Sequence, residues 1–276
     1  MPPKNKKRDS RVVAPDILSY LPENIIDAIV MHLPLRDAVR TSILSKKWSW
    51  CCTQLSQIKA PKLRYFAFTG KIIFISLKGV PLLAKLSLVD TGYSEKAGKR
   101  GITKFLESFP ALEHLHLDYY SVRFFAGEVP KQLRSALNSL KRLHLSDISL
   151  DELDVASCAL YLTKSSPFLQ EIEIEVYDEW IGPAAADVIN EILEQVEGLS
   201  EVTSNHLIAV KLTGITCTDP EMELIKLLLA KSPMLAIMLI KNGLGAESPE
   251  TRLKLLAEIT QFQHASPKAE VVYELT

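Results

Sequence analysis

The sequence predicts an α/β protein in which a solenoid of parallel strands with helical returns follows a small helical module. Three observations support this prediction. A short apolar motif recurs along the chain from residue 58 onward. Segments with apolar residues at three- and four-residue spacing lie between its copies, as in amphipathic helices. Residues 16–50 have helical patterns of their own, interrupted by proline.

The recurring motif reads P/N-x-L-x-x-Φ-x-Φ, where Φ is an apolar residue. The steps between the first leucines of successive copies are 20, 29, 28, 29, 38 and 28 residues, and most fall in the range of leucine-rich repeats. Each copy should form a short strand with its leucines inward, and the strands should pair in parallel to build a horseshoe. The first leucines are Leu63, Leu83, Leu112, Leu140, Leu169, Leu207 and Leu235.

The segments between the copies should return along the other side of the sheet as helices. In the segment 183–198, proline at the start and glycine at the end are typical helix boundaries. A last strand is expected at 269–275, where the chain should cap the open end of the solenoid. The predicted helices are 99–109, 129–138, 151–164, 183–198, 220–231 and 249–262.

The N-terminal part has two segments of different character. Residues 1–15 are basic and proline-rich with little to bury, so they should form a disordered tail. This tail is either a nuclear localisation signal or simply a solvated segment. Residues 16–52 should form three short helices, the first of which ends at Pro34 because proline cannot continue it. Such a small module needs a partner or the following domain to bury its apolar residues.

The composition limits which cellular compartment and which classes of partner we expect for this chain. The net charge is −1 and hydrophobic residues make up 47% of the chain, which favours neither nucleic acid nor a membrane surface as partner. The four cysteines form no C-x-x-C pair, there is no N-x-S/T sequence, and no apolar run approaches the roughly 18 residues of a membrane span. We therefore expect a location in the nucleus or cytoplasm, or in both.

The helical module resembles an F-box. The residues that support this likeness are Leu21-Pro22-Glu23, Leu33-Pro34-Leu35-Arg36-Asp37 and Leu44-Ser45-Lys46-Lys47-Trp48. The C-terminal part, residues 206–241 with the ending 265–273, resembles an FBD segment. The whole chain is similar to plant F-box/FBD/LRR-repeat proteins, which implies an F-box at 16–52, leucine-rich repeats at 58–200 and an FBD-like cap at 201–276.

The resemblance implies a non-catalytic role. F-box proteins are substrate-recognition subunits of SCF (Skp–cullin–F-box) ubiquitin ligases, in which the F-box docks on a Skp-type adaptor, and through it a cullin, while the C-terminal domain holds a protein substrate. The absence of nucleophile-elbow, P-loop, zincin and dinucleotide-binding motifs agrees with this role. By matching positions, the adaptor-binding residues would be Leu21, Pro22, Ile25, Ile29, Leu33, Pro34, Val39, Leu44 and Trp48.

Two departures from the family leave an alternative open. After Trp48 the chain continues Ser49-Trp50, where the family usually has arginine and then an apolar residue. Only a short stretch separates the F-box from the first repeat, where the family has a longer linker and further repeats, so the chain should be internally shortened. The alternative is a non-ligase interaction module, or a shortened competitor of full-length relatives.

The residues between the inward leucines should face outward on the sheet. This face is either a surface that binds the substrate or a solvated surface. No cofactor and no metal are expected, although His114, His116 and His144 could converge on a metal if they are not simply exposed histidines in a repeating position. The candidate substrate-binding residues are Tyr65, Lys85, His114, His116, Arg142, His144, Glu171 and Glu173.

Overall fold

A computed structural model describes Ile25 and residues 57–72, 75–91, 101–126, 137–177, 204–216, 218–243 and 249–274. The chain divides into two compact units, residues 1–58 with 74–76, and residues 59–73 with 77–276. Strands β1 (Gln57–Ile58) and β3 (Ser76–Leu77) form a two-stranded sheet. The helices predicted for residues 16–52 lie outside the described residues, apart from Ile25, which is helical.

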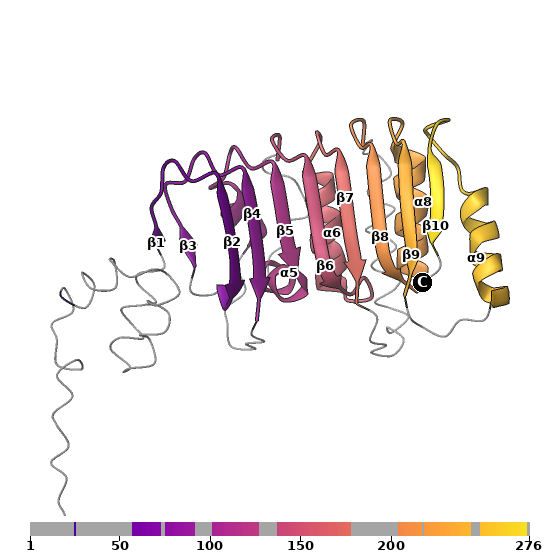
Figure 1. The fold of residues 1–276 in the computed structure, drawn as a ribbon, viewed down its shortest axis with the longest axis horizontal. Helices are drawn as coiled ribbons and strands as arrows, with labels where there is room; N and C mark the ends of the chain where they lie inside the picture. Colours follow the sequence, from indigo (N-terminus) through magenta and orange to yellow (C-terminus); the bar gives the residue numbers. More distant parts are fainter. Residues whose placement is uncertain are drawn as a thin grey trace, which may run out of the picture. The chain divides into compact units, whose positions relative to one another are not determined.

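The second unit is built on an eight-stranded sheet with the order β10-β9-β8-β7-β6-β5-β4-β2 (Figure 1). All seven strand pairs are parallel, which confirms the predicted α/β class. Strands β2 and β4–β9 each begin two residues after the first leucine of a motif copy. The strands are β2 (Tyr65–Gly70), β4 (Lys85–Asp90), β5 (His114–Asp118), β6 (Arg142–Ile148), β7 (Glu171–Val176), β8 (Ala209–Ile215), β9 (Ile237–Asn242) and β10 (Glu270–Glu274).

The proline or asparagine of each motif copy lies in a turn that precedes the strand. In the second copy, the Leu83 N–H donates to the Val80 carbonyl at 3.1 Å, so Pro81 occupies the second position of the turn. Proline suits this position because its ring already holds the required φ angle. The same bond, from the first leucine to the residue three positions before it, recurs in all seven copies. The turn therefore fixes where each strand starts.

Neighbouring repeats are joined just before their strands by a carbonyl that accepts two N–H groups. The Ala84 carbonyl accepts from the Glu113 and His114 N–H groups at 2.8 and 2.9 Å. The same arrangement links each following pair of strands up to β9. Because one carbonyl receives two donors from the next repeat, the register of each strand is fixed by its predecessor.

The inward positions form two continuous apolar rows across the sheet. Leu86 pairs with Leu115 in β5, and Leu88 pairs with Leu117, in the register of the parallel ladder. From β4 to β9 these inward residues are no more than 3% exposed. In β2, Phe66 and Phe68 are only half-buried, in keeping with its position at the edge of this sheet. The rows consist of Leu86, Leu115, Leu143, Ile172, Val210 and Met238, and of Leu88, Leu117, Leu145, Ile174, Leu212 and Ile240.

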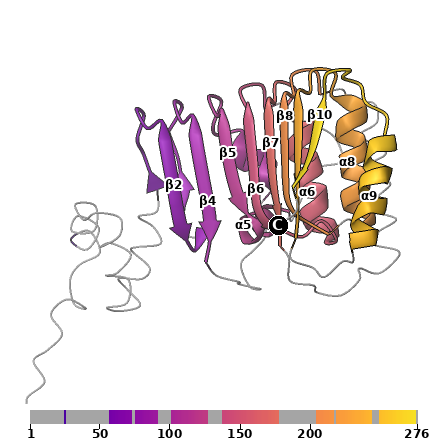
Figure 2. The ribbon, with the colours of Figure 1, turned by 45° about the vertical axis from the view of Figure 1, so that its right-hand side comes forward.

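The described helices α5, α6 and α8 lie on one side of the sheet and leave the other face open (Figures 1 and 2). The structure confirms the helices predicted at 151–164, 220–231 and 249–262. The helix predicted at 99–109 is shorter and forms α4. Helix α5 was not predicted. Of the helix predicted at 129–138 only residues 137–138 are described, and the helix predicted at 183–198 lies outside the described residues. The helices are α4 (Ile102–Leu106), α5 (Tyr119–Phe125), α6 (Leu153–Lys164), α8 (Asp219–Lys231) and α9 (Pro249–Gln261).

Helix α5 begins directly where β5 ends, because Asp118 caps it. The Asp118 carboxylate accepts from the Ser121 N–H at 3.1 Å, from the Ser121 hydroxyl, and from the Asp90 N–H of β4 at 3.0 Å. This buried carboxylate therefore connects two strands and a helix.

No helix in the described part of the chain is both long and apolar enough to cross a membrane.

We predict that Leu86→Ala lowers the free energy of unfolding by about 2 to 5 kcal/mol, because it leaves a cavity in the inner row. The control is Lys85→Ala, at the neighbouring exposed position, which should change stability by less than about 0.5 kcal/mol. Urea unfolding followed by circular dichroism measures both. Equal losses in the two variants would contradict the assignment of inward and outward positions.

We also predict that Gly214→Ala destabilises the sheet more than Gly79→Ala does. Both glycines have a positive φ, but a Cβ at Gly214 would lie 2.2 Å from the Val176 carbonyl oxygen, whereas one at Gly79 meets nothing within 4 Å. The first variant should lose at least about 2 kcal/mol and the second about 1 kcal/mol, the cost of the backbone conformation alone. Thermal unfolding of both variants would show this order, and the reverse order would exclude the close approach of β8 to β7.

Candidate functional site

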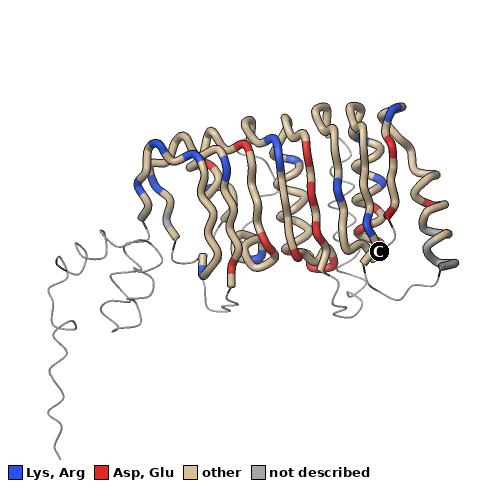
Figure 3. The backbone as a smooth tube through the Cα atoms, in the orientation of Figure 1, with Lys and Arg blue, Asp and Glu red and all other residues tan. Residues whose placement is uncertain are grey.

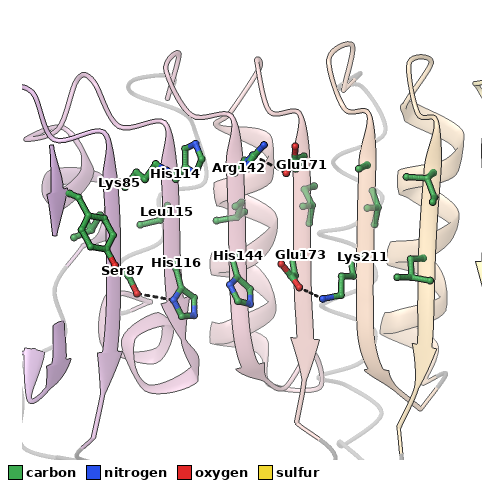
Figure 4. A pocket seen from close by; sticks show the side chains of 18 residues that line it. Lys85, Ser87, His114, Leu115, His116, Arg142, His144, Glu171, Glu173 and Lys211 are labelled. Atoms are coloured by element: carbon green, nitrogen blue, oxygen red, sulfur yellow. Dashed lines mark hydrogen bonds and ion pairs between the residues drawn. The ribbon is translucent and has the colours of Figure 1, made fainter. Parts of the chain in front are cut away.

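The open face of the sheet has a groove of about 500 Å³ that extends from β2 to β9 (Figure 4). All eight of the predicted candidate residues line it: Tyr65, Lys85, His114, His116, Arg142, His144, Glu171 and Glu173. The groove also includes Lys211 of β8 and Ile237 and Leu239 of β9. None of these three is among the candidate substrate-binding residues predicted above, although each occupies an outward position in its copy of the motif.

One row of outward residues lies near the start of the strands. Strand pairing places Tyr65 beside Lys85, Lys85 beside His114, and His114 beside Arg142. The Arg142 Nε atom lies 2.8 Å from the Glu171 Oε2 atom, and Tyr65 is 61% exposed. Burial, followed by the charges of Lys85 and Arg142, lowers the pKa of His114 below its ordinary value. The row therefore has basic groups on β4 and β6 with a histidine between them that resists protonation.

A second row, two residues further along, is centred on a stacked pair of histidines. The rings of His116 and His144 are 4.2 Å apart with an interplanar angle of 12°. His116 Nδ1 lies 2.8 Å from the Ser87 hydroxyl and its Nε2 lies 3.0 Å from the Ser146 hydroxyl. Burial, and then the neighbouring His144, lowers the pKa of His116. The ring of His116 is thus held in place by a hydroxyl on each side.

Acidic residues gather on β7 (Figure 3), and Glu173 of this strand lies beside His144 of β6 in the strand register (Figure 4). The Lys211 ammonium donates to the Glu173 carboxylate. Burial tends to raise the pKa of Glu173, but the hydrogen bond from Lys211 and the charges of His144 and Lys211 together outweigh it, so this pKa is lowered. The same hydrogen bond raises the pKa of Lys211. Glu173 and Lys211 therefore form a neutral pair across β7 and β8.

The structure groups a different set of potential metal ligands from the three histidines considered above. Among the described residues, His144, Glu173 and Glu175 have ligand atoms within 4.8 Å of one another. His144 Nε2 lies 3.5 Å from Glu175 Oε1, which is too long for a strong hydrogen bond. Lys211 already neutralises Glu173, so a metal ion would have to compete with an ammonium group. Both ring nitrogens of His116 contact hydroxyls, which leaves this ring poorly placed to bind a metal.

The described cysteine, Cys158, lies in α6 and is fully buried. Burial raises the pKa of its thiol to about 12, so its thiolate is not available as a nucleophile at neutral pH. Cys51, Cys52 and Cys217 lie outside the described residues.

Of the predicted adaptor-binding residues, Ile25 is helical and 42% exposed. The other eight, Leu21, Pro22, Ile29, Leu33, Pro34, Val39, Leu44 and Trp48, lie outside the described residues.

The fold and the groove define a repeat protein that presents an open, mixed-charge sheet face. Residues 18–54 match the F-box domain family. The chain is 22% identical to F-box/FBD/LRR-repeat protein At1g13570 of Arabidopsis thaliana over 262 residues, which is 90% of this chain and 58% of that protein. The chain thus contains a segment that matches the F-box domain family, and over most of its length it is similar to an F-box/FBD/LRR-repeat protein of a plant.

Other proteins of Arabidopsis thaliana are also similar to this chain. Over 79 residues, or 26% of this chain and 16% of the relative, the chain is 37% identical to putative F-box/FBD/LRR-repeat protein At5g22610. Over 179 residues, or 58% of this chain and 38% of the relative, it is 27% identical to F-box/LRR-repeat protein At5g02910. The chain thus spans less than two thirds of the length of each of these relatives.

We predict that protonation of His114 and His116 opposes folding. Both pKa values lie below the ordinary 6.5 in the folded chain, so the unfolded chain takes up these protons first. The stability from these histidines is present above pH 6.5 and is lost as the pH falls below it. Urea unfolding across this range should show a shallower loss for a His114→Gln/His116→Gln variant than for the unmodified chain. Equal slopes would contradict the lowered pKa values.

Proposed function

We propose that this chain is the substrate-recognition subunit of an SCF ubiquitin ligase, with its F-box docked on a Skp-type adaptor and its repeat face bound to a protein target. The observation that supports this most is that one chain combines an F-box match at residues 18–54 with an open, groove-bearing sheet face. The proposed adaptor contacts are the nine matching residues named above. The proposed location is the nucleus or cytoplasm, or both.

The proposed mechanism needs no chemistry in this chain. The repeats hold a target while the adaptor and cullin bring a ubiquitin-charged enzyme close to it, so that the local concentration of target lysines rises. F-box proteins in general act as substrate adaptors of this kind. The groove is suited to the holding role because its side chains come from seven strands of one continuous sheet, and the paired strands keep them at fixed spacing.

We predict that the chain co-purifies with a plant Skp adaptor and that a Leu33→Ala/Pro34→Ala variant loses this binding. Truncating two apolar anchors in a small interface should cost at least about 2 kcal/mol, or about 30-fold in affinity. Surface plasmon resonance on immobilised adaptor measures the difference. The matched control is Lys226→Ala, an exposed position on α8, which should bind like the unmodified chain. A folded chain without adaptor affinity would refute the ligase role.

A reconstituted ubiquitination assay separates this function from its alternative. A ligase subunit should support transfer of ubiquitin to a bound target in the presence of adaptor, cullin and conjugating enzyme. Target binding without transfer, together with competition against a full-length relative, would instead favour a non-ligase interaction module.

A further inference from the structure

The groove has a basic end with one charge that is not balanced. Lys85, His114 and Arg142 are direct neighbours in the register of β4, β5 and β6, so the three side chains originate within about 10 Å of one another. All three line the groove, and the Lys85 side chain extends toward His114 (Figure 4). Arg142 pairs with Glu171, whereas no described residue forms an ion pair with Lys85. The row from Lys85 to Glu171 thus has a surplus of one positive charge while His114 is neutral.

The opposite end of the groove is apolar. Ile237 and Leu239 of β9 line it, and Ile237 is 41% exposed. Ala209 of β8 lies beside Ile237 in the strand register. Exposed branched side chains next to a small residue form a shallow apolar surface that an apolar group of a partner can cover. This end of the groove therefore differs chemically from the basic end.

The middle of the groove is neutral. Lys211 and Glu173 balance each other, and the rings of His116 and His144 stack beside them. A partner that crosses this part needs no charge of its own. The distance from β5 to β9 is four strand spacings, or about 19 Å, and an extended chain covers this distance in about six residues.

We propose that the groove binds an extended segment of the target protein that places a carboxylate side chain on Lys85, His114 and Arg142 and an apolar side chain, about six residues away, on Ile237 and Leu239. This proposal names the target class for the face that the proposed function assigns to substrate binding, and it rests on that function only for its biological role. The single surplus charge favours a carboxylate, which has one negative charge. A phosphate dianion would exceed that charge.

A bound carboxylate should also change the histidine at this end of the groove. His114 faces Lys85 from β4, Arg142 from β6, and the carboxylates of Glu113 and Glu171. In the free chain burial and then the two basic groups oppose its protonation, and a carboxylate between the basic groups offsets their effect. Binding should therefore tighten as the pH falls below 6.5, because the imidazolium adds a second positive charge. A His114→Gln variant should lose most of this pH dependence.

The experiment selects from a displayed library of random twelve-residue peptides on the full chain. The enriched sequences should share an Asp or Glu about six residues from a Leu, Ile, Val, Met or Phe. Fluorescence polarisation with an enriched peptide should then show about a tenfold loss for Lys85→Glu and for Ile237→Asp, and little change for the control Lys226→Glu on α8. A peptide with its acidic residue changed to Lys should regain binding to Lys85→Glu.

Several results would overturn the proposal. They are enrichment of basic peptides, binding that ignores both Lys85 and Ile237, and a library that yields no enrichment. A phosphoserine peptide that binds at least about tenfold more tightly than its glutamate counterpart would show that phosphate, and not carboxylate, is the ligand. Adaptor binding is measured on the same preparations. A chain that binds the peptide but no adaptor would refute the ligase function and leave this inference standing.

Discussion

The in-register parallel pairing of the strands determines the rest of the structure. A shift of one residue between two strands would turn the buried leucines outward and the groove residues inward, because side chains alternate between the two faces. The turn before each strand and the shared carbonyl beside it prevent such a shift, for example at Ala84, which accepts from both Glu113 and His114. The same constraint that buries Leu115 therefore sets the distance between Lys85 and Arg142.

The groove uses positions that contribute little to the core. Its residues alternate with the inward leucines on the same strands, so that its charges are held at fixed spacing by a framework to which they hardly contribute. Surface ion pairs such as Arg142–Glu171 and Lys211–Glu173 add little stability when they are exposed to this degree. Their main effect is on the electrostatics of the face, where they cancel most of the charge and leave a local surplus near β4.

The sequence alone predicted the strands well, because each first leucine sits at a fixed distance from its proline or asparagine and the strand follows two residues later. It predicted which residues face outward for the same reason. It did not predict α5, because a helix that is capped by the last residue of a strand has no separate turn signal. Nor did it predict that Glu173 pairs with Lys211 or that His116 stacks on His144, since these choices depend on side-chain rotamers and on the spacing between strands.

The carbonyls that accept two N–H groups also affect the order in which the repeats unfold. In each case the acceptor belongs to one repeat and both donors belong to the next, so interior repeats are secured on both sides and an edge repeat on one side only. Opening from β10 breaks the contacts of a single interface, whereas opening at β6 breaks two. Hydrogen exchange should therefore progress from the ends of the sheet inward, and the central strands that hold the stacked histidines should exchange last.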